Sequence, residues 1–252
     1  MNDNYELTEP TREAVRESHA LGATVVLCTG RGPGNAIPVL ERLGLEGVLI
    51  THNGAATVQT PGPKLLAQCH FHMKDVEELV HYCRQRRVHF DFNTAFELYA
   101  ESLTAKEEAM YKQYMIEPNR VADALQFAEP VVKVTMFGTA EQMDRTEREL
   151  KDVPLDDRLV WIRSGDYFID VMSVEAGKGR ALARFAQIKG VGQEEVLAIG
   201  NYFNDIGMLE YAGLGIAMDN SPEAVKRAAD AVTASNNDDG VQQALMRYVL
   251  NR

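Results

Sequence analysis

The sequence lacks several features that would assign it to a special class of protein. Its 252 residues include three cysteines (Cys28, Cys69 and Cys83) and no C-x-x-C pair, which favours a reduced, cytoplasmic setting. No stretch approaches the roughly 20 consecutive apolar residues that cross a bilayer, and no basic-then-apolar export signal opens the chain. We therefore expect a cytoplasmic protein with no membrane segment.

Basic residues are also scarce. Lys and Arg total 26 against 37 Asp and Glu, which gives a formal net charge of −11 at pH 7. Proteins that bind nucleic acid present a basic face, so this balance argues against nucleic acid as a partner. An anionic substrate would need a local positive pocket or a metal ion. Composition indicates no oligomeric state, but 45% hydrophobic residues suffice for one large or two modest domains.

Both ends of the chain alternate helices with short apolar strands. Residues 23–28 form a continuous apolar run, which predicts a strand buried on both faces. Further strands are expected at 48–51, 196–199, 214–217 and 231–233. The expected helices cover 9–21, 178–189 and 205–211, with another beginning at 221 and one more closing the chain. A further helix is expected to follow the turn at Gly32-Pro33-Gly34 and to end at Gly44. This alternation predicts a parallel sheet with helices on both sides.

The middle of the chain has a different pattern. Pro61-Gly62-Pro63 marks a boundary, beyond which aromatic, alternating strands are expected. These strands lie at 88–93, 96–100, 131–137, 159–162 and 168–172, with polar helices at 75–86 and 140–151. We therefore predict an α+β domain over 60–175, inserted into a discontinuous core domain made of 1–59 and 176–252.

Four polar motifs follow predicted strands or open predicted helices. They are Thr29-Gly30-Arg31, Asn53-Gly54, Gly177-Lys178-Gly179 and Gly200-Asn201-Tyr202-Phe203-Asn204-Asp205. The carboxyl ends of parallel strands meet at one edge of a sheet, where ligands bind. A hydroxyl, free loop N–H groups and a lysine suit a phosphoryl group. Oxygens from Asn201 and Asp205 suit a hard cation such as Mg²⁺.

Each motif alone has a simpler interpretation. Thr29 could cap an ordinary turn, and Lys178 could be a solvated surface lysine, although a cation in the first helical turn opposes the helix dipole. Asn204 could cap the next helix, with Asp205 complementing its dipole. The acidic pair Asp238-Asp239 is expected to lie in a solvated loop.

Together the motifs resemble the Cof-type (class IIB) branch of the haloacid dehalogenase superfamily, and residues 236–241 are similar to a segment near that family's C-terminus. The resemblance implies an α/β fold, with a Rossmann-like parallel-sheet core and an inserted α+β cap. It also implies Mg²⁺-dependent hydrolysis of small phosphorylated metabolites, such as sugar phosphates, through an aspartyl-phosphate. The residues implied in phosphate or substrate binding are Thr29, Gly30, Arg31, Asn53, Lys178 and Asn204. Lys178 is also implied in catalysis, and Asn201 and Asp205 in metal binding.

Two departures from the family pattern qualify this expectation. The family's first motif, Asp-x-Asp-Gly-Thr, supplies the nucleophile and the acid/base, and the printed sequence does not contain it. Residues 1–8 match the stretch that follows that motif in relatives, as if the chain were truncated or its start placed late. Position 201 is Asn where the family usually has a metal-binding Asp, so Mg²⁺ should bind more weakly.

These departures predict an inactive or severely impaired chain. Without the first-motif strand, two interior sheet edges would be unpaired, so we expect poor stability or strand swapping. An in-frame Asp-x-Asp-Gly-Thr upstream would support a phosphatase lineage. The alternative is a non-catalytic phosphate- or sugar-phosphate-binding protein, and a phosphotransferase or mutase is a third hypothesis. The sequence does not indicate which phosphorylated substrate is used.

Overall fold

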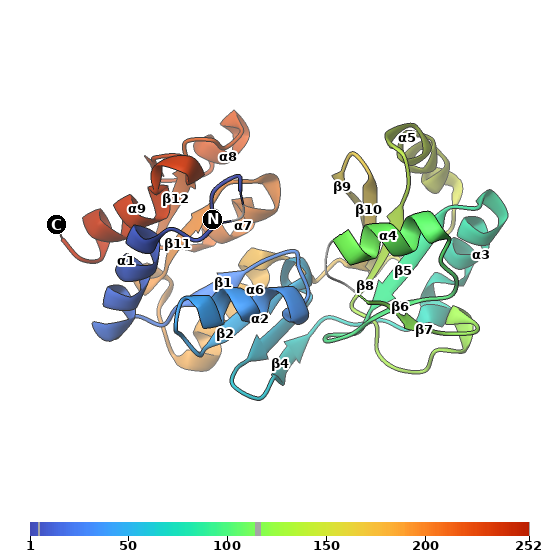
Figure 1. The fold of residues 1–252 in the computed structure, drawn as a ribbon, viewed down its shortest axis with the longest axis horizontal. Coiled ribbons are helices and arrows are strands. Elements are labelled where there is room, and N and C mark those ends of the chain that lie inside the picture. Colours follow the sequence, from blue (N-terminus) through green and yellow to red (C-terminus); the bar gives the residue numbers. More distant parts are fainter. Residues whose placement is uncertain (5, 114–116, 252) are drawn as a thin grey trace. The chain divides into compact units, whose positions relative to one another are not determined.

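The computed structural model describes residues 1–4, 6–113 and 117–251, and the chain divides into two compact units (Figure 1). The first unit comprises Met1–Ala67 and Gly177–Arg252, and the second comprises Gln68–Ala176. Tyr5, part of the N-terminal stretch compared above with relatives, lies outside the described residues. The first unit extends to residue 67, beyond the predicted boundary at 59, because one further strand, at Lys64–Gln68, continues its sheet.

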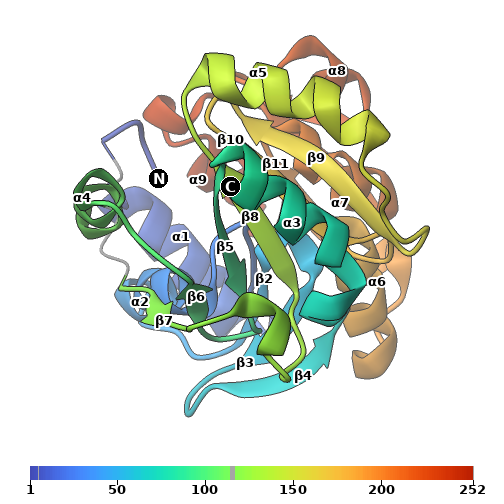
Figure 2. The same ribbon diagram turned by 90° about the vertical axis from the view of Figure 1, so that its right-hand side faces the viewer.

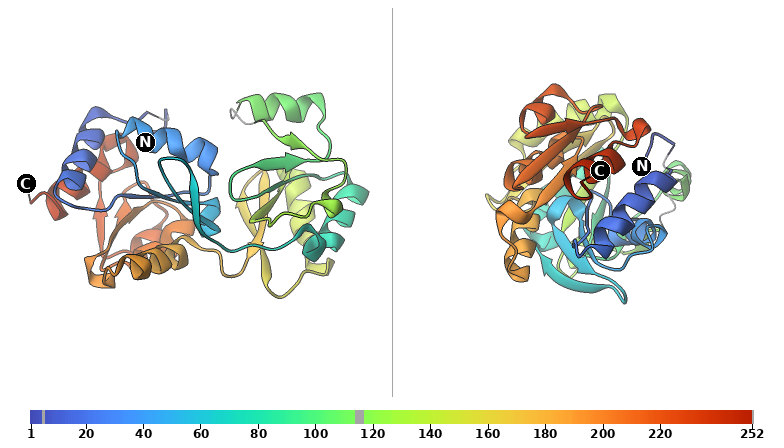
Figure 3. Two further views of the ribbon diagram at one scale, coloured as in Figure 1. Left: turned by 90° about the horizontal axis from the view of Figure 1, so that it is seen from below. Right: turned by 90° about the vertical axis from the view of Figure 1, so that its left-hand side faces the viewer.

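The first unit alternates short strands and helices. Its strands are β1 (Val26–Cys28), β2 (Val48–Thr51), β3 (Ala56–Gln59), β4 (Lys64–Gln68), β11 (Leu197–Gly200), β12 (Leu214–Met218) and β13 (Ala231–Thr233). Its helices are α1 (Glu9–Ala20), α2 (Pro33–Arg42), α6 (Lys178–Lys189), α7 (Ile206–Tyr211), α8 (Glu223–Arg227) and α9 (Gly240–Tyr248). Helices α1 and α9, from the two ends of the chain, pack side by side (Figure 3). The sequence patterns predict all of these elements except β3 and β4.

The sheet of the first unit is in two pieces. One has the strand order β1-β2-β3-β4 and the other β11-β12-β13. Neighbours are parallel in β1–β2 and throughout the second piece, whereas β3 runs antiparallel to β2. Among the described residues, β1 and β11 each pair with a strand on one side only. Side chains of Val26, Cys28 and Ala198 nevertheless pack into one hydrophobic cluster.

Strand β1 differs from its prediction. It covers only Val26–Cys28 instead of 23–28, and all three residues are half-buried rather than buried on both faces. The adjacent strand β2 is fully buried. The prediction was wrong because it rested on the apolar run alone, whereas β1 pairs with a strand on one side only within the described residues.

The second unit is built on one continuous sheet. Its strands are β5 (His89–Asn93), β6 (Leu98–Ala100), β7 (Asn119–Arg120), β8 (Lys133–Phe137), β9 (Leu159–Gly165) and β10 (Phe168–Ser173). They lie in the order β7-β6-β5-β8-β10-β9. Its helices are α3 (Glu77–Arg86), α4 (Ala105–Gln113) and α5 (Ala140–Glu149). The sequence patterns did not predict α4 and β7. No helix in the described part of the chain is both long and apolar enough to cross a membrane.

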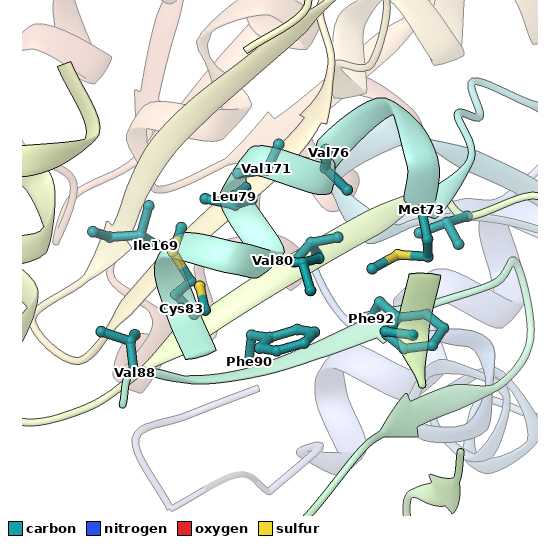
Figure 4. Packing of buried hydrophobic residues seen from close by; sticks show 14 of the residues in the cluster. Met73, Val76, Leu79, Val80, Cys83, Val88, Phe90, Phe92, Ile169 and Val171 are labelled. Carbon is teal, nitrogen blue, oxygen red and sulfur yellow. The ribbon is translucent and has the colours of Figure 1, made fainter. Parts of the chain in front are cut away.

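Helices α3 and α5 cover one face of this sheet (Figure 2). Val80 of α3 packs with Phe90 and Phe92 of β5 in the core of the unit (Figure 4). Asp91 lies between these phenylalanines and points to the opposite face, since side chains alternate along a strand. There it accepts a 2.6 Å hydrogen bond from the hydroxyl of Tyr111 in α4. Helix α4 therefore lies on the face opposite α3 and α5.

Candidate phosphate site

Loops at the carboxyl ends of β1, β2 and β11 meet in the first unit. Thr29 follows β1, and its carbonyl oxygen accepts a 3.0 Å hydrogen bond from the N–H of Asn53, which follows β2. The Oδ1 atom of Asn53 in turn accepts a 3.0 Å hydrogen bond from Nδ2 of Asn204, which follows β11. Gly30 is needed beside this contact, because a Cβ there would lie 2.7 Å from Asn53 Oδ1. Three of the sequence motifs are thus in direct contact.

The fourth motif joins the others through two glycines. Gly54 has a φ of +94°, and a Cβ at this position would lie 2.3 Å from the carbonyl carbon of Gly177. Only glycine allows the two backbones to approach so closely with this φ. This contact places the start of α6, and with it Lys178, beside the loop that carries Asn53.

Lys178 and Asp205 form a buried ion pair. Both residues are less than 8% exposed, and Lys178 Nζ donates to Asp205 Oδ1 at 2.6 Å. Asp205 Oδ2 accepts from the backbone N–H groups of Asn201 and Tyr202 at 2.8 and 3.0 Å. The solvated-lysine interpretation of Lys178 is therefore excluded. A buried charge of this kind is tolerated because it is paired and hydrogen-bonded.

The structure also decides the interpretation of Asn204. It lies within a single 3₁₀ turn (Phe203–Asp205) ahead of α7, and its side-chain amide donates to Asn53. Helix α7 has no side-chain cap. Asn204 therefore joins two loops rather than capping a helix.

Several donors at this edge could bind an anion. The hydroxyl oxygen of Thr29 accepts a 3.1 Å hydrogen bond from the N–H of Arg31, which leaves its own hydrogen to donate. The Arg31 residue is exposed. Gly177, the N-cap of α6, provides no side-chain acceptor, so N–H groups of the first turn point out of the helix beside the Lys178 cation. A hydroxyl, helix N–H groups and a lysine together match the oxygens of a phosphate.

The residues at this edge do not by themselves fit Mg²⁺. Both carboxylate oxygens of Asp205 already accept hydrogen bonds within the protein. Asn201 adds one neutral amide oxygen, whereas Mg²⁺ is usually bound through one or two carboxylates. Within the ranges that the structure describes, no group of three or more His, Cys, Asp or Glu side chains could hold a metal ion.

Cys28 lies next to the residues of the candidate phosphate site, and the motif analysis did not identify it. It ends β1 directly before Thr29, where it interacts electrostatically with Lys178 and Asp205. Burial in the apolar cluster raises the pKa of its thiol to about 12, against a smaller opposing effect of Lys178. The thiol is therefore neutral at physiological pH. Its position next to Thr29 was the signal in the sequence that could have identified it.

The N-terminal segment and the 236–241 segment bind one another. Asp3 accepts 2.8 Å hydrogen bonds from the side-chain amides of Asn236 and Asn237. Asp239 accepts hydrogen bonds from the hydroxyls of Thr8 and Thr11. The expectation of a solvated loop at Asp238-Asp239 was therefore wrong for Asp239. These contacts hold the start of the chain against the start of α9.

Comparisons with known proteins agree with this fold. The sequence model of the haloacid dehalogenase-like hydrolases matches residues 1–245. The protein YxeH of Bacillus subtilis is 31% identical over 258 residues, covering 99% of this chain and 94% of YxeH. Another B. subtilis relative, 5-amino-6-(5-phospho-D-ribitylamino)uracil phosphatase YwtE, is 26% identical over 266 residues, covering 96% and 91%. A solved haloacid dehalogenase-like hydrolase from Bacteroides thetaiotaomicron has a TM-score of 0.86 at 24% identity, covering 98% and 94%.

An α/β unit interrupted by an inserted α+β unit defines the class of fold. The match over residues 1–245 identifies the family within that class. The chain belongs to the haloacid dehalogenase-like hydrolases, and the expected fold class is confirmed. Its lineage is that of a hydrolase, and similar proteins are named phosphatases.

Proposed function

We propose that this chain binds small phosphorylated metabolites, of the sugar-phosphate type, at the edge formed by Thr29, Asn53, Lys178 and Asn204. The convergence of these four residues from separate loops carries the proposal. Lys178 neutralises phosphoryl oxygens, whose charge is spread over several atoms. The Thr29 hydroxyl and the N–H groups of the α6 first turn orient them. The partner is then a small molecule, and the second unit is the family's cap.

The proposed chemistry in the lineage is phosphomonoester hydrolysis through an aspartyl-phosphate. Among the site residues named here only Asp205 has a carboxylate, and both of its oxygens are held by Lys178 and backbone N–H groups, so it is not placed to attack phosphorus. The 252 printed residues contain no Asp-x-Asp-Gly-Thr segment. We therefore propose that these residues bind phosphate but do not cleave its ester.

Divalent-metal dependence belongs to the same proposal. Phosphatases of this superfamily generally use a divalent metal, here expected to be Mg²⁺ near Asn201 and Asp205. The donor set at this edge is incomplete, so tight metal binding requires a further carboxylate. An Asp-x-Asp segment would supply two. The printed chain alone is then expected to bind Mg²⁺ weakly, which isothermal titration can measure.

The decisive experiment compares two proteins. One is the printed chain, and the other carries an added N-terminal strand ending in Asp-x-Asp-Gly-Thr. We expect no hydrolysis of p-nitrophenyl phosphate by the printed chain and measurable turnover by the extended one. In the extended protein, Lys178→Met should lower kcat by about 100-fold or more, because one electrostatic contact to the transition state is lost.

Lys189→Met is the matched control, since Lys189 lies on the same helix but is exposed. Hydrolysis of p-nitrophenyl phosphate by the printed chain would refute the proposal. A different result would favour the alternative function. If the extended protein is inactive but the printed chain binds inorganic phosphate through Lys178, the hypothesis of a non-catalytic phosphate-binding protein replaces that of a phosphatase.

A further inference from the structure

The second unit has a cavity of its own between α4 and the sheet. Its volume is about 380 Å³, which falls within the range of small-molecule pockets. All of its lining residues lie between Arg87 and Phe168, so it contains none of the phosphate-site residues. Its wall contains three aromatic rings, those of Phe137, Tyr167 and Phe168. It also contains two cationic side chains, those of Arg87 and Lys106.

The cations of this cavity are available for a ligand. Arg87 and Lys106 are both exposed, and neither side chain forms a salt bridge within the described residues. Among the described residues the same wall holds one acid, Glu107, whose Oε1 lies 3.3 Å from Nδ1 of His89. Burial lowers the pKa of this imidazole, so His89 is neutral at pH 7 and the two cations outnumber the one carboxylate. The cavity is therefore locally positive in a protein with a formal net charge of −11.

A second hollow continues this positive surface along α5. It shares Thr139 and Gln142 with the first cavity and adds Arg145 and Arg148. The acids on the other side of α5, Asp144 and Glu147, pair with Arg163 of β9. Two arginines, Arg145 and Arg148, therefore line this hollow. Glu141 is the one acid that lines it among the described residues.

The backbone beside the cavity is built to hold Arg87 in place. Arg87 ends α3 with a φ of +54°, the left-handed conformation in which many helices end, and the N–H of Val88 donates to the Cys83 carbonyl at 2.9 Å. Its carbonyl oxygen accepts a 3.3 Å hydrogen bond from the side chain of Gln142. Gln142 crosses close over Gly138, where a Cβ would lie 2.3 Å from Gln142 Oε1. These contacts fix the backbone of Arg87 at the wall of the cavity.

The rings give the cavity a planar wall. The rings of Phe137 and Phe168 lie 5.2 Å apart, and His89 meets Phe137 edge to face. Tyr167 is 53% exposed, although a ring of this size is usually covered. An exposed aromatic ring next to free cations suits a ligand that has both a flat ring and a negative charge.

We propose that this cavity is a binding site for a phosphorylated ligand with a planar aromatic ring, of the nucleoside diphosphate class. The ring stacks on Tyr167 and Phe168, and the phosphates lie toward Arg87, Lys106 and the arginines of α5. The site does not depend on the proposed function of the first unit.

The test is calorimetric titration of the whole chain with ADP, with adenosine and with tripolyphosphate. ADP should bind at least about tenfold more tightly than either part alone. The double variant Arg87→Glu/Lys106→Glu should weaken ADP binding by about 100-fold, and Tyr167→Ala by about tenfold. Lys112→Glu, a matched charge reversal on the same helix α4, should have no effect. Circular dichroism confirms that each variant is folded.

Lys178→Met separates this site from the phosphate site of the first unit. ADP binding that is lost in Lys178→Met but kept in Arg87→Glu/Lys106→Glu overturns the proposal. So does tripolyphosphate binding as tight as that of ADP, since the ring would then contribute nothing. Absence of ADP binding at millimolar concentration also overturns it.

Discussion

The two units of the molecule differ in how completely their sheets are closed. In the second unit, six strands form one continuous sheet, and a single cluster of buried side chains fills one face. In the first unit, the sheet is in two pieces and the buried apolar residues fall into two clusters. The candidate phosphate site lies on the less complete unit. Its Asn53–Asn204 hydrogen bond joins a loop of one sheet piece to a loop of the other.

The largest expected difference is in amide hydrogen exchange. Strands β1 and β11 should exchange at least about 1000-fold faster than β5 and β8, because an edge strand pairs on one side and opens locally. Exchange followed by mass spectrometry measures this. Adding a strand in front of Met1 should slow exchange in β1 and β11 while leaving β5 unchanged. Equal protection of all four strands in a monomeric chain would contradict the comparison, and also the prediction of poor stability or strand swapping.

A matched pair of core substitutions tests the packing of each unit. Phe92 is fully buried in the second unit, so Phe92→Ala should lower the free energy of unfolding by about 3–5 kcal/mol. Val26 of β1 is half-buried, so Val26→Ala should cost about 1 kcal/mol. Urea unfolding followed by circular dichroism measures both. A Val26→Ala effect as large as that of Phe92→Ala would show that the first unit is as tightly packed as the second.

The pH dependence of stability tests the polar face of the second unit. Burial raises the pKa of Asp91 from 3.8 to about 6. The folded state therefore holds a proton that the unfolded state has lost, and stability falls as pH rises from about 4 to 6. The loss should be on the order of 3 kcal/mol. Asp91→Asn should remove this part of the dependence, whereas Asp157→Asn, at an exposed residue, should keep it. A profile unchanged by Asp91→Asn would show that Asp91 does not titrate in this range.

The smallest expected effect is in thiol reactivity. Burial raises the pKa of both Cys28 and Cys83 to about 12, so both are neutral at pH 8 and react slowly. The access of the reagent to each thiol then decides the labelling rates, because Cys28 lies in the half-buried β1 whereas Cys83 is 1% exposed. In a Cys69→Ser background, an aromatic disulfide reagent should label Cys28 about tenfold faster than Cys83. Faster labelling of Cys83 would place the more open core in the second unit.

Local sequence patterns predicted most of the elements that form the two units. Apolar runs and 3.6-residue periodicity located α6 at residues 178–189 and β13 at 231–233, with the bounds that the structure has. Helix α4 was missed because it is polar on all sides. Tyr111 attaches it through a hydrogen bond to Asp91, and no periodicity reveals such a contact. The hairpin β3–β4 was missed because Pro61-Gly62-Pro63 was interpreted as a boundary between domains instead of a turn.

The sequence by itself determined the family, the alternation of strands and helices, and the residue types that can hold a phosphate, because these depend on short-range order and side-chain chemistry. The tertiary structure alone decided which alternative holds for each motif. Lys178 is buried because Asp205 folds back to meet it, and Asn204 binds Asn53 across 151 positions of sequence. It also showed that β1 and β11 are edge strands in the described part of the chain, since strand pairing depends on neighbours distant in sequence.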